Sequence, residues 1–249
     1  MEPFVYQAQP QRVVFGSGTI AATGEELARL GCAHAFVLAT PQQEDSAETL
    51  KASLGSLCAG GFAGAAMHTP VDVTEKALRA VEEAGADCIV SLGGGSTTGL
   101  GKAIALRTDL PQIVIPTTYA GSEATPIIGE TAGGRKTTQR TLKVLPEVIL
   151  YDIELTLTLP VGLTVTSALN AIAHAVEARY ARDRNPIISL LALDSIRALA
   201  GALPRIVEDP RNRDARSDAL YGAWAAGTCL GNVGMALHHK ICHVLGGTF

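Results

Sequence analysis

The sequence is poor in aromatic residues and lacks the signals of a secreted, membrane-spanning or nucleic-acid-binding protein. Aromatic residues make up 4% of the 249 residues, and the formal net charge is -4 with acids and bases interspersed. Nucleic acid and anionic membranes are bound by clustered positive charge, a pattern this composition does not show. The N-terminus has no basic stretch followed by an apolar run, and no apolar run approaches the roughly 20 residues that span a bilayer. We therefore expect a cytoplasmic protein with no membrane or nucleic-acid partner.

The cysteines form no recognisable framework. Their number is odd, and none is spaced as Cys-x-x-Cys. A disulfide-stapled secreted domain has an even number of cysteines at regular spacings. The pattern is typical of buried or incidental thiols in a reducing compartment. The residues concerned are Cys32, Cys58, Cys88, Cys229 and Cys242.

Apolar residues are abundant, at 47% of the chain against 18% charged residues. This proportion supplies a large hydrophobic core and excludes an intrinsically disordered chain. A length of 249 residues is enough for one large domain or two ordinary ones.

The chain up to residue 154 alternates short β-branched runs with segments of helical periodicity. This pattern is typical of an open α/β sheet, in which right-handed crossovers produce a mostly parallel strand order. The predicted strands are Arg12–Phe15, Ala35–Ala39, Cys88–Leu92, Gln112–Ile115 and Val148–Tyr151, with a weaker candidate at Phe62–Met67. The predicted helices between them are Thr23–Leu30, Ser46–Leu57, Val73–Ala84 and Gly99–Leu106.

The pattern changes near Asp152–Pro160, and no strand is predicted beyond it. Long Ala- and Leu-rich amphipathic segments follow instead. Residues 1–154 are therefore predicted to form an α/β domain and residues 155–249 an all-helical domain, with a ligand cleft between the two. The chain stops soon after Gly246-Gly247, so we expect the helical domain to be incomplete. Its predicted helices are Leu163–Ala181, Ile187–Leu203, Ala215–Leu230 and Gly234–Leu245.

A glycine-rich turn follows the predicted strand Cys88–Leu92. It reads Gly93-Gly94-Gly95-Ser96-Thr97 and opens a helix, whose free N-terminal amides would bind an anion. It matches neither a Walker A loop nor the GxGxxG pattern, and a plain tight turn is the alternative. Because α/β proteins bind ligands at the carboxyl ends of their strands, we interpret it as a cradle for a dinucleotide pyrophosphate.

A second loop, Pro116–Glu123, follows the next strand along the chain and is rich in hydroxyl groups. Pro-Thr-Thr alone is ordinary loop chemistry, but these hydroxyls would face the same crevice as the glycine turn. We expect Thr117 and Thr118 to contact the cofactor, and Tyr119 and Ser122 to contact the substrate.

Polar residues spaced four apart recur in the helical half. Asn170 and His174 would share one helix face, and His239 and His243 would share another. Two such helices crossing would bring three imidazoles and a carboxamide into one pocket, which could bind a metal or handle protons. For each pair alone, a satisfied polar pair in the core or a solvated helix face is the alternative.

A basic segment begins at Arg135 and Lys136, after Gly133-Gly134. For most of its residues a solvated connection is the favoured interpretation. Arg135 or Lys136 remains a candidate contact for a substrate carboxylate.

Four ordered motifs together resemble the iron-containing alcohol dehydrogenase superfamily, and within it they are most similar to the maleylacetate reductases of bacterial aromatic catabolism. The motifs are Gly93–Lys102, Pro116–Glu123, Asn170–Glu177 and His239–Gly246. The resemblance implies a dehydroquinate synthase-like architecture with an NAD(P)-binding α/β domain, a homodimer, and a small dicarboxylate substrate. It also implies reduction of the C=C bond of maleylacetate to 3-oxoadipate. His174, His239 and His243 would then orient and polarise the substrate, with Asn170 as support.

The resemblance also bears on metal binding. Metal-dependent members of the superfamily carry an aspartate where this chain has Asn170, and another where it has Gly99, while His174 and His239 match their histidine ligands. A neutral amide is a poor replacement for a carboxylate around a divalent cation. We therefore expect no catalytic metal.

The expected nicotinamide cofactor is NADH, with NADPH also possible. Thr40 follows the strand Ala35–Ala39, and neither a ribose-binding acid nor an arginine comes directly after it. Three other hypotheses stay open. A metal-dependent alcohol or polyol dehydrogenase would be chelator-sensitive, a dehydroquinate synthase-like cyclase would bind NAD without net turnover, and a fragment would be inactive or only bind.

Overall fold

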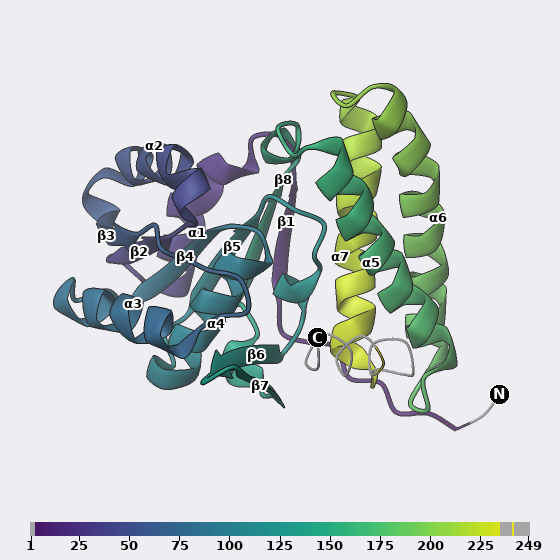
Figure 1. Cartoon of the computed structure of the whole chain (residues 1–249), viewed down its shortest axis with the longest axis horizontal. Coiled ribbons are helices and arrows are strands. Elements are labelled where there is room, and N and C mark those ends of the chain that lie inside the picture. The colour runs from purple at the N-terminus through teal and green to yellow at the C-terminus, as the bar shows by residue number, and fades with distance from the viewer. Residues whose placement is uncertain (1–2, 235–240, 242–249) are drawn as a thin grey trace. The chain divides into compact units, whose positions relative to one another are not determined.

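The computed structural model describes residues 3–234 and Ile241, and the chain forms two units (Figure 1). The α/β unit consists of Gln11–Thr117 and Pro126–Asp152. The helical unit consists of Met1–Pro10, Thr118–Thr125 and Ile153–Phe249. The helical unit thus includes two segments that lie before the expected boundary at residue 154. In the first segment Gln9 donates to the Gly231 carbonyl at 2.6 Å, and in the second a Cβ atom on Gly121 would lie 3.1 Å from Gly227 Cα.

The α/β unit is built on six parallel strands in the order β1-β8-β5-β4-β2-β3. This order confirms the predicted mostly parallel sheet. In the register of β4 and β5, Gly93 lies opposite Pro116, so the carboxyl ends of these two strands are level. The strands are β1 (Arg12–Gly16), β2 (Ala35–Leu38), β3 (Cys58–Phe62), β4 (Cys88–Gly93), β5 (Gln112–Pro116) and β8 (Val148–Asp152).

Strand β3 lies at Cys58–Phe62 and not at the expected Phe62–Met67. Its centre is Gly60-Gly61, and glycine weakens a strand pattern in sequence. A Cβ atom on Gly61 would lie 2.9 Å from the carbonyl oxygen of Val37 in β2. The glycines therefore let the two backbones come close, which is a tertiary requirement.

Four helices flank the sheet: α1 (Thr23–Leu30), α2 (Glu44–Leu54), α3 (Val71–Glu83) and α4 (Gly95–Thr108). The apolar residues of α3 and α4 pack on the sheet, and the cluster includes Phe36, Ile89 and Ile104. Burial of these side chains is the main favourable term for this packing. Helix α4 begins four residues before the expected start, directly at the glycine turn.

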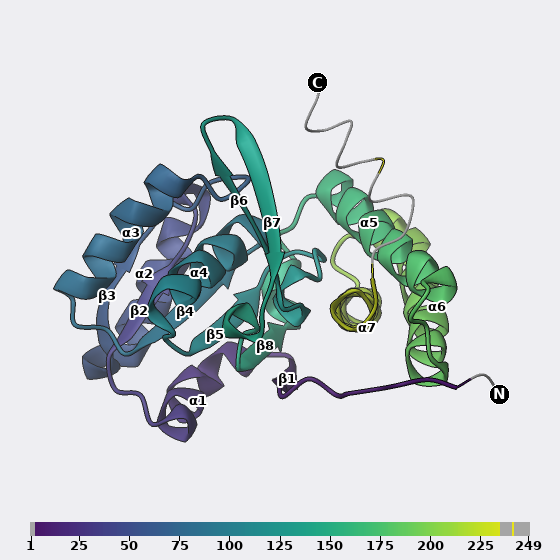
Figure 2. The same ribbon diagram turned by 90° about the horizontal axis from the view of Figure 1, so that it is seen from below.

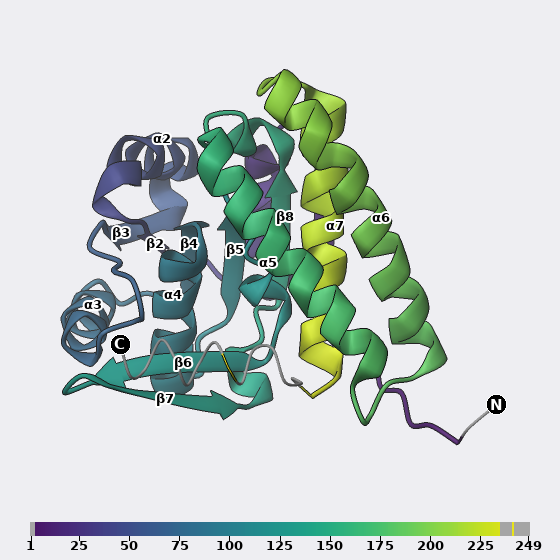
Figure 3. The same ribbon diagram turned by 45° about the vertical axis from the view of Figure 1, so that its right-hand side comes forward.

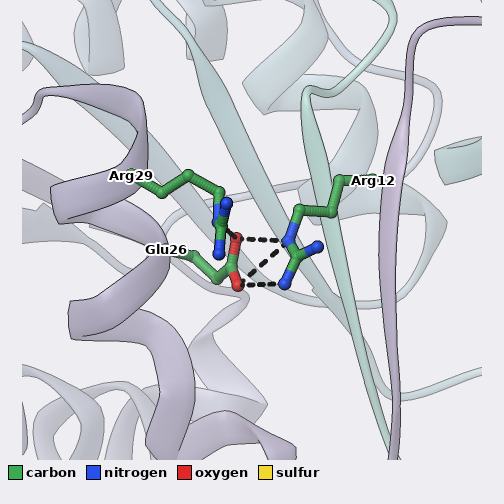
Figure 4. Close-up of polar contacts among 3 residues, drawn as sticks. All are labelled: Arg12, Glu26 and Arg29. Atoms are coloured by element: carbon green, nitrogen blue, oxygen red, sulfur yellow. Dashed lines mark hydrogen bonds and ion pairs between the residues drawn. The ribbon is translucent and has the colours of Figure 1, made fainter.

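An ion pair joins α1 to the edge strand β1 (Figure 4). The Arg12 guanidinium donates to both carboxylate oxygens of Glu26 at 2.9 to 3.1 Å, and Arg29 lies 3.4 Å from the same carboxylate. Hydrogen bonding to Glu26 raises the pKa of Arg12. The Glu26 side chain is only 4% exposed, so this two-point contact fixes the helix against the sheet edge.

An antiparallel hairpin, β6 (Ile127–Ala132) and β7 (Arg135–Arg140), was not predicted. Its turn is Gly133-Gly134, and both glycines have positive φ, of 55° and 75°, as a tight hairpin turn requires. All of β7 is exposed, so it shows no alternation of apolar and polar residues. Figure 3 shows the hairpin beside α4.

The hairpin is anchored to α4 by two cations. Arg107 pairs with Glu130 at 2.8 Å, and the Lys102 ammonium donates to the Ile127 carbonyl at 2.9 Å. The hairpin therefore belongs to the α/β unit although it lies outside the main sheet.

The described part of the helical unit contains three long helices that pack on one another, α5 (Val161–Tyr180), α6 (Pro186–Glu208) and α7 (Arg213–Asn232). In Figure 2, α7 is seen end-on with α5 and α6 beside it. Asn185 caps α6 by accepting from the Ile188 amide, and Asn212 caps α7 by accepting from the Ala215 amide. Within the described residues of this unit there is no strand, as the sequence predicted. The expected helix Gly234–Leu245 lies almost wholly outside the described residues.

Helix α6 is long and apolar enough to cross a membrane by length and composition alone, contrary to the expectation of no such run. One helix of this kind is weak evidence. Its buried residues Ile188, Ala192 and Leu199 recur at helical spacing, and α6 packs on both α5 and α7. We interpret it as a bundle helix that packs on its neighbours through one face, because only 28% of its apolar stretch is buried.

Candidate functional site

The carboxyl ends of β2, β4 and β5 bring three of the predicted cofactor residues together. Thr40 follows β2, Gly93 ends β4, and Thr117 follows β5. The Thr117 amide donates to the Gly93 carbonyl at 3.1 Å, which extends the pairing of the two strands into the loop. Residues far apart in sequence are thus gathered at the sheet edge where α/β proteins bind ligands.

The backbone at the end of β4 requires glycine. Gly93 has a φ of 151°, and a Cβ atom there would lie 2.6 Å from Gln43 Oε1 and would clash with Thr97 Oγ1. Gly94 is the N-cap of α4 and provides no side-chain cap, so the amides of the first turn have no capping partner. The turn therefore brings the polar side chains of Gln43 and Thr97 close to the Gly93 backbone, at the positive end of a helix.

The first turn of α4 also carries an unsatisfied hydroxyl. Thr97 is fully buried, and its Oγ1 makes no hydrogen bond in the described part of the chain. Buried hydroxyls without a partner are rare and costly. A bound phosphate oxygen would supply the missing acceptor. The expected cradle of Gly93, Gly94, Gly95, Ser96 and Thr97 thus fits a dinucleotide pyrophosphate.

Gln43 is a site residue that sequence reasoning missed. It lies in the 3₁₀ turn η2 (Pro41–Gln43), and its Nε2 donates to Thr117 Oγ1 at 2.8 Å. Thr40 Oγ1 donates to Gln43 Oε1 at 3.4 Å. Nothing in the sequence separates Gln43 from its exposed neighbour Gln42, because only the geometry of the turn decides which side chain points toward β5.

The segment after Thr117, the β5 loop (Thr118–Thr125), belongs to the helical unit. Gly121 packs directly on Gly227 of α7, where a Cβ atom would clash with the Gly121 carbonyl oxygen. Ser122 begins the 3₁₀ turn η4 (Ser122–Ala124), and its carbonyl accepts from the Thr125 hydroxyl at 2.8 Å. The loop is therefore shaped by α7.

The structure places Tyr119, an expected substrate contact, inside the helical unit. It is fully buried, and its hydroxyl accepts a hydrogen bond from Arg216 Nη1 at 3.3 Å. Because both the ring and the hydroxyl are engaged inside the helical unit, Tyr119 anchors the β5 loop. A motif shows which residues are present in a loop, but it does not show which of them turn inward.

Arg216 is a second residue that the sequence analysis overlooked. Its guanidinium is fully buried and donates to the Thr164 hydroxyl at 2.8 Å and to the carbonyls of Pro210 and Leu159 at 3.0 and 3.1 Å. All of these acceptors, like Tyr119, are neutral. A buried cation tolerates such a setting only when its hydrogen bonds are nearly complete. Arg216 therefore fixes α7, α5 and the β5 loop to one another.

Asn170 and His174 lie one turn apart on α5, as predicted. Asn170 is exposed, whereas His174 is 7% exposed. Glu177, one turn further along, is buried and accepts from the Tyr180 hydroxyl at 3.3 Å. His239 and His243 lie outside the described residues, so their predicted convergence with His174 stays a prediction.

Arg135 and Lys136 lie at the start of β7 and are exposed. The Lys136 stem lies over Gly129, with its Cε 2.9 Å from the position of a Cβ on that glycine. This placement is that of a solvated hairpin, the interpretation favoured for most of the basic segment.

The expectation of no catalytic metal stays a prediction, because His239 and His243 lie outside the described residues. Among residues 3–234 and Ile241, no group of three His, Cys, Asp or Glu side chains is placed to hold one. At the position where a carboxylate would neutralise a cation, Asn170 offers a neutral amide oxygen. His174 is the one imidazole of the expected set that the described residues contain.

Comparisons with known proteins agree along the whole chain. The family model for iron-containing alcohol dehydrogenase matches residues 10–153, and that for the C-terminal part of the Fe-containing alcohol dehydrogenase family matches residues 164–249. The chain is 62% identical over 248 residues to the maleylacetate reductase of Rhizobium sp. strain MTP-10005, covering 100% of this chain and 71% of that protein. It is 55% identical over 246 residues to the maleylacetate reductase of Sphingobium indicum, covering 99% and 70%.

Solved structures give the same result. The crystal structure of maleylacetate reductase from Agrobacterium tumefaciens has a TM-score of 0.98 at 62% identity, covering 100% of this chain and 71% of that one. Sulfoacetaldehyde reductase from Bifidobacterium kashiwanohense, solved with NAD+, has a TM-score of 0.93 at 21% identity, covering 100% and 72%. At that identity the likeness concerns the fold alone.

Proposed function

This chain belongs to the iron-containing alcohol dehydrogenase family, and we propose that it reduces maleylacetate to 3-oxoadipate with a nicotinamide cofactor. The observation that carries the proposal is 62% identity to a maleylacetate reductase over 248 residues. The glycine turn at Gly93, with its unsatisfied Thr97 hydroxyl, supports dinucleotide binding independently.

The overall reaction adds one hydride and one proton across the C=C bond of the substrate. The cofactor, when bound, supplies the hydride. Because the double bond is conjugated with a ketone, negative charge develops on the ketone oxygen as an enolate. Hydrogen-bond donors placed at that oxygen lower the barrier, and a group that can release a proton completes the addition.

We assign these tasks to the residues of the helical unit. His174, His239 and His243 would bind and polarise the substrate, with one of them donating the proton. Asn170 would support them through its amide. Arg135 or Lys136 and Ser122 remain candidates for substrate contact, whereas the buried Tyr119 would act by holding the β5 loop.

We propose that this reaction proceeds without a catalytic metal. An enolate formed by conjugate addition can be stabilised by neutral or cationic hydrogen-bond donors, while an unactivated ketone depends more on a Lewis acid. The neutral Asn170 favours the first route. A metal-dependent alcohol dehydrogenase is the second candidate, because the matching family model is that of iron-containing enzymes.

We further propose NADH as the preferred cofactor with NADPH also accepted, a homodimer, and a cytoplasmic location. The absence of an acid or an arginine directly after Thr40 supports relaxed cofactor choice. The four free cysteines among the described residues support a reducing compartment.

The test is NADH oxidation by the purified chain with maleylacetate, after dialysis against a strong chelator and again after adding Fe²⁺ or Zn²⁺. Turnover that survives the chelator supports the proposal. Turnover that is lost with chelator and restored by metal favours the metal-dependent dehydrogenase. A folded chain that binds NADH but leaves maleylacetate unchanged overturns the substrate assignment.

A further inference from the structure

Gln43 spans the carboxyl ends of three neighbouring strands. It follows β2, its Nε2 reaches Thr117 after β5 at 2.8 Å, and its Oε1 lies 2.6 Å from where a Cβ on Gly93 of β4 would be. Thr40 Oγ1 donates to the same Oε1 at 3.4 Å. The Gln43 side-chain amide therefore lies next to both Gly93 and Thr117.

The hydrogen bond from Gln43 determines whether the Thr117 hydroxyl acts as donor or acceptor. A threonine hydroxyl has one proton to donate and two lone pairs that accept. Because Gln43 Nε2 carries only protons, Thr117 must accept that bond, and its own proton is left for another acceptor. The described protein groups supply no acceptor for it.

Two hydroxyls with unused hydrogen-bonding capacity therefore flank Gly93. The second is the buried Thr97 Oγ1, which makes no hydrogen bond in the described part of the chain. The Thr117 and Thr97 hydroxyls lie beside the first turn of α4, whose backbone amides have no side-chain cap to act as acceptor. The shared requirement of these groups is an anion with several oxygens.

We propose that Gln43 is a positioning residue for the dinucleotide, which orients the Thr117 hydroxyl proton toward the pyrophosphate. The inference rests on the proposed function in taking a nicotinamide dinucleotide as the ligand. Gln43 acts on cofactor affinity and not on the chemical step, because its partner lies at the phosphate cradle. NADH and NADPH share the pyrophosphate, so both depend on Gln43 equally.

The experiment measures the dissociation constants of NADH and NADPH by the fluorescence of the bound cofactor, on the full chain. The variants are Gln43→Leu, Thr117→Val and the two combined. The matched control is Gln42→Leu, at the exposed neighbouring position in the same turn. Thermal melting verifies that each variant is folded.

We expect Gln43→Leu and Thr117→Val each to weaken binding of both cofactors by about ten- to a hundredfold, the usual contribution of one hydrogen bond to a charged group. The double variant should be no weaker than Thr117→Val, because Gln43 acts through that hydroxyl. Gln42→Leu should stay within about twofold of the wild type. In Gln43→Leu the KM for NADH should rise by the same factor as the dissociation constant, and by more than any change in the turnover number.

Three results would overturn the inference alone: unchanged affinity in Gln43→Leu, effects that multiply in the double variant, or a loss confined to NADPH. A loss confined to NADPH would place Gln43 at the adenosine ribose, because the 2′-phosphate there is what distinguishes NADPH from NADH. A wild-type chain that binds neither cofactor would overturn the proposed function itself. If the wild type binds both cofactors and Gln43→Leu weakens that binding as expected, but maleylacetate is not reduced, the inference stands and only the substrate assignment is overturned.

Discussion

Replacing Gly227 with alanine should disrupt the contact between α7 and the β5 loop. A Cβ atom at residue 227 would lie 2.9 Å from Gly121 Cα and 3.0 Å from the Gly121 carbonyl carbon, with the carbonyl oxygen closer still. Carbon atoms in contact normally sit about 3.5 Å apart or more, so the backbones must separate by at least about 0.6 Å. Neither neighbour is a flexible side chain that could move aside.

The free energy of unfolding follows from two opposing terms. Overpacking a filled contact costs about 1–3 kcal/mol, and the rigid neighbours here favour the upper end. Alanine also favours the helix over glycine by about 1 kcal/mol. Gly201→Ala in α6 is the matched control, because a Cβ there meets nothing within 4 Å. Since both variants gain the same helix propensity, the difference between them should be the overpacking cost, about 3 kcal/mol.

Urea unfolding read by tryptophan fluorescence measures this difference. The chain has one tryptophan, Trp224, and it lies on α7, so its emission reports on the helical unit. We expect Gly201→Ala to unfold at a slightly higher urea concentration than the wild type, and Gly227→Ala at a clearly lower one. Equal midpoints for the two variants would refute the backbone contact between α7 and the loop.

Three further predictions concern buried charge and the absent carboxylate. Burial raises the pKa of Glu147, so its ionisation opposes folding, and this penalty grows as pH rises above the ordinary value of 4.5. Glu147→Gln should therefore unfold at a higher urea concentration than the wild type at pH 7. The same difference between the two urea midpoints at pH 3 as at pH 7 would contradict this. Arg216→Lys keeps the charge but loses the planar fork and should destabilise the helical unit by about 2–4 kcal/mol, with an unchanged Trp224 transition as the contrary result. Asn170→Asp alone should not create metal-dependent oxidation of simple alcohols, because one ligand does not rebuild a substrate pocket; wild-type-like rates with added Fe²⁺ would disprove this.

The predicted parts of the site are those that local chemistry specifies. Gly93–Thr97 is recognisable because a strand, a set of glycines and a helix start follow one another within a few residues. The β5 loop is recognisable for the same reason. Gln43 and Arg216 were missed, because each gains its role from a partner at least 50 residues away, with no signal around it. The motif around Tyr119 was recognised, but it did not reveal that the Tyr119 ring is buried.

The sequence by itself determined where most strands and helices lie. The periodicity of apolar residues shows which side of each element is buried. For this reason α1 has its expected bounds, and the strands β4 and β5, which end at Gly93 and just before Thr117, were predicted. Tertiary structure decided the rest. Strand β3 contains Gly61, which lets it approach the β2 backbone, and the exposed strand β7 has no buried face to leave a pattern. The β5 loop takes its shape from α7, a hundred residues away, because backbone contact through Gly121 and Gly227 exists only once the helix has packed.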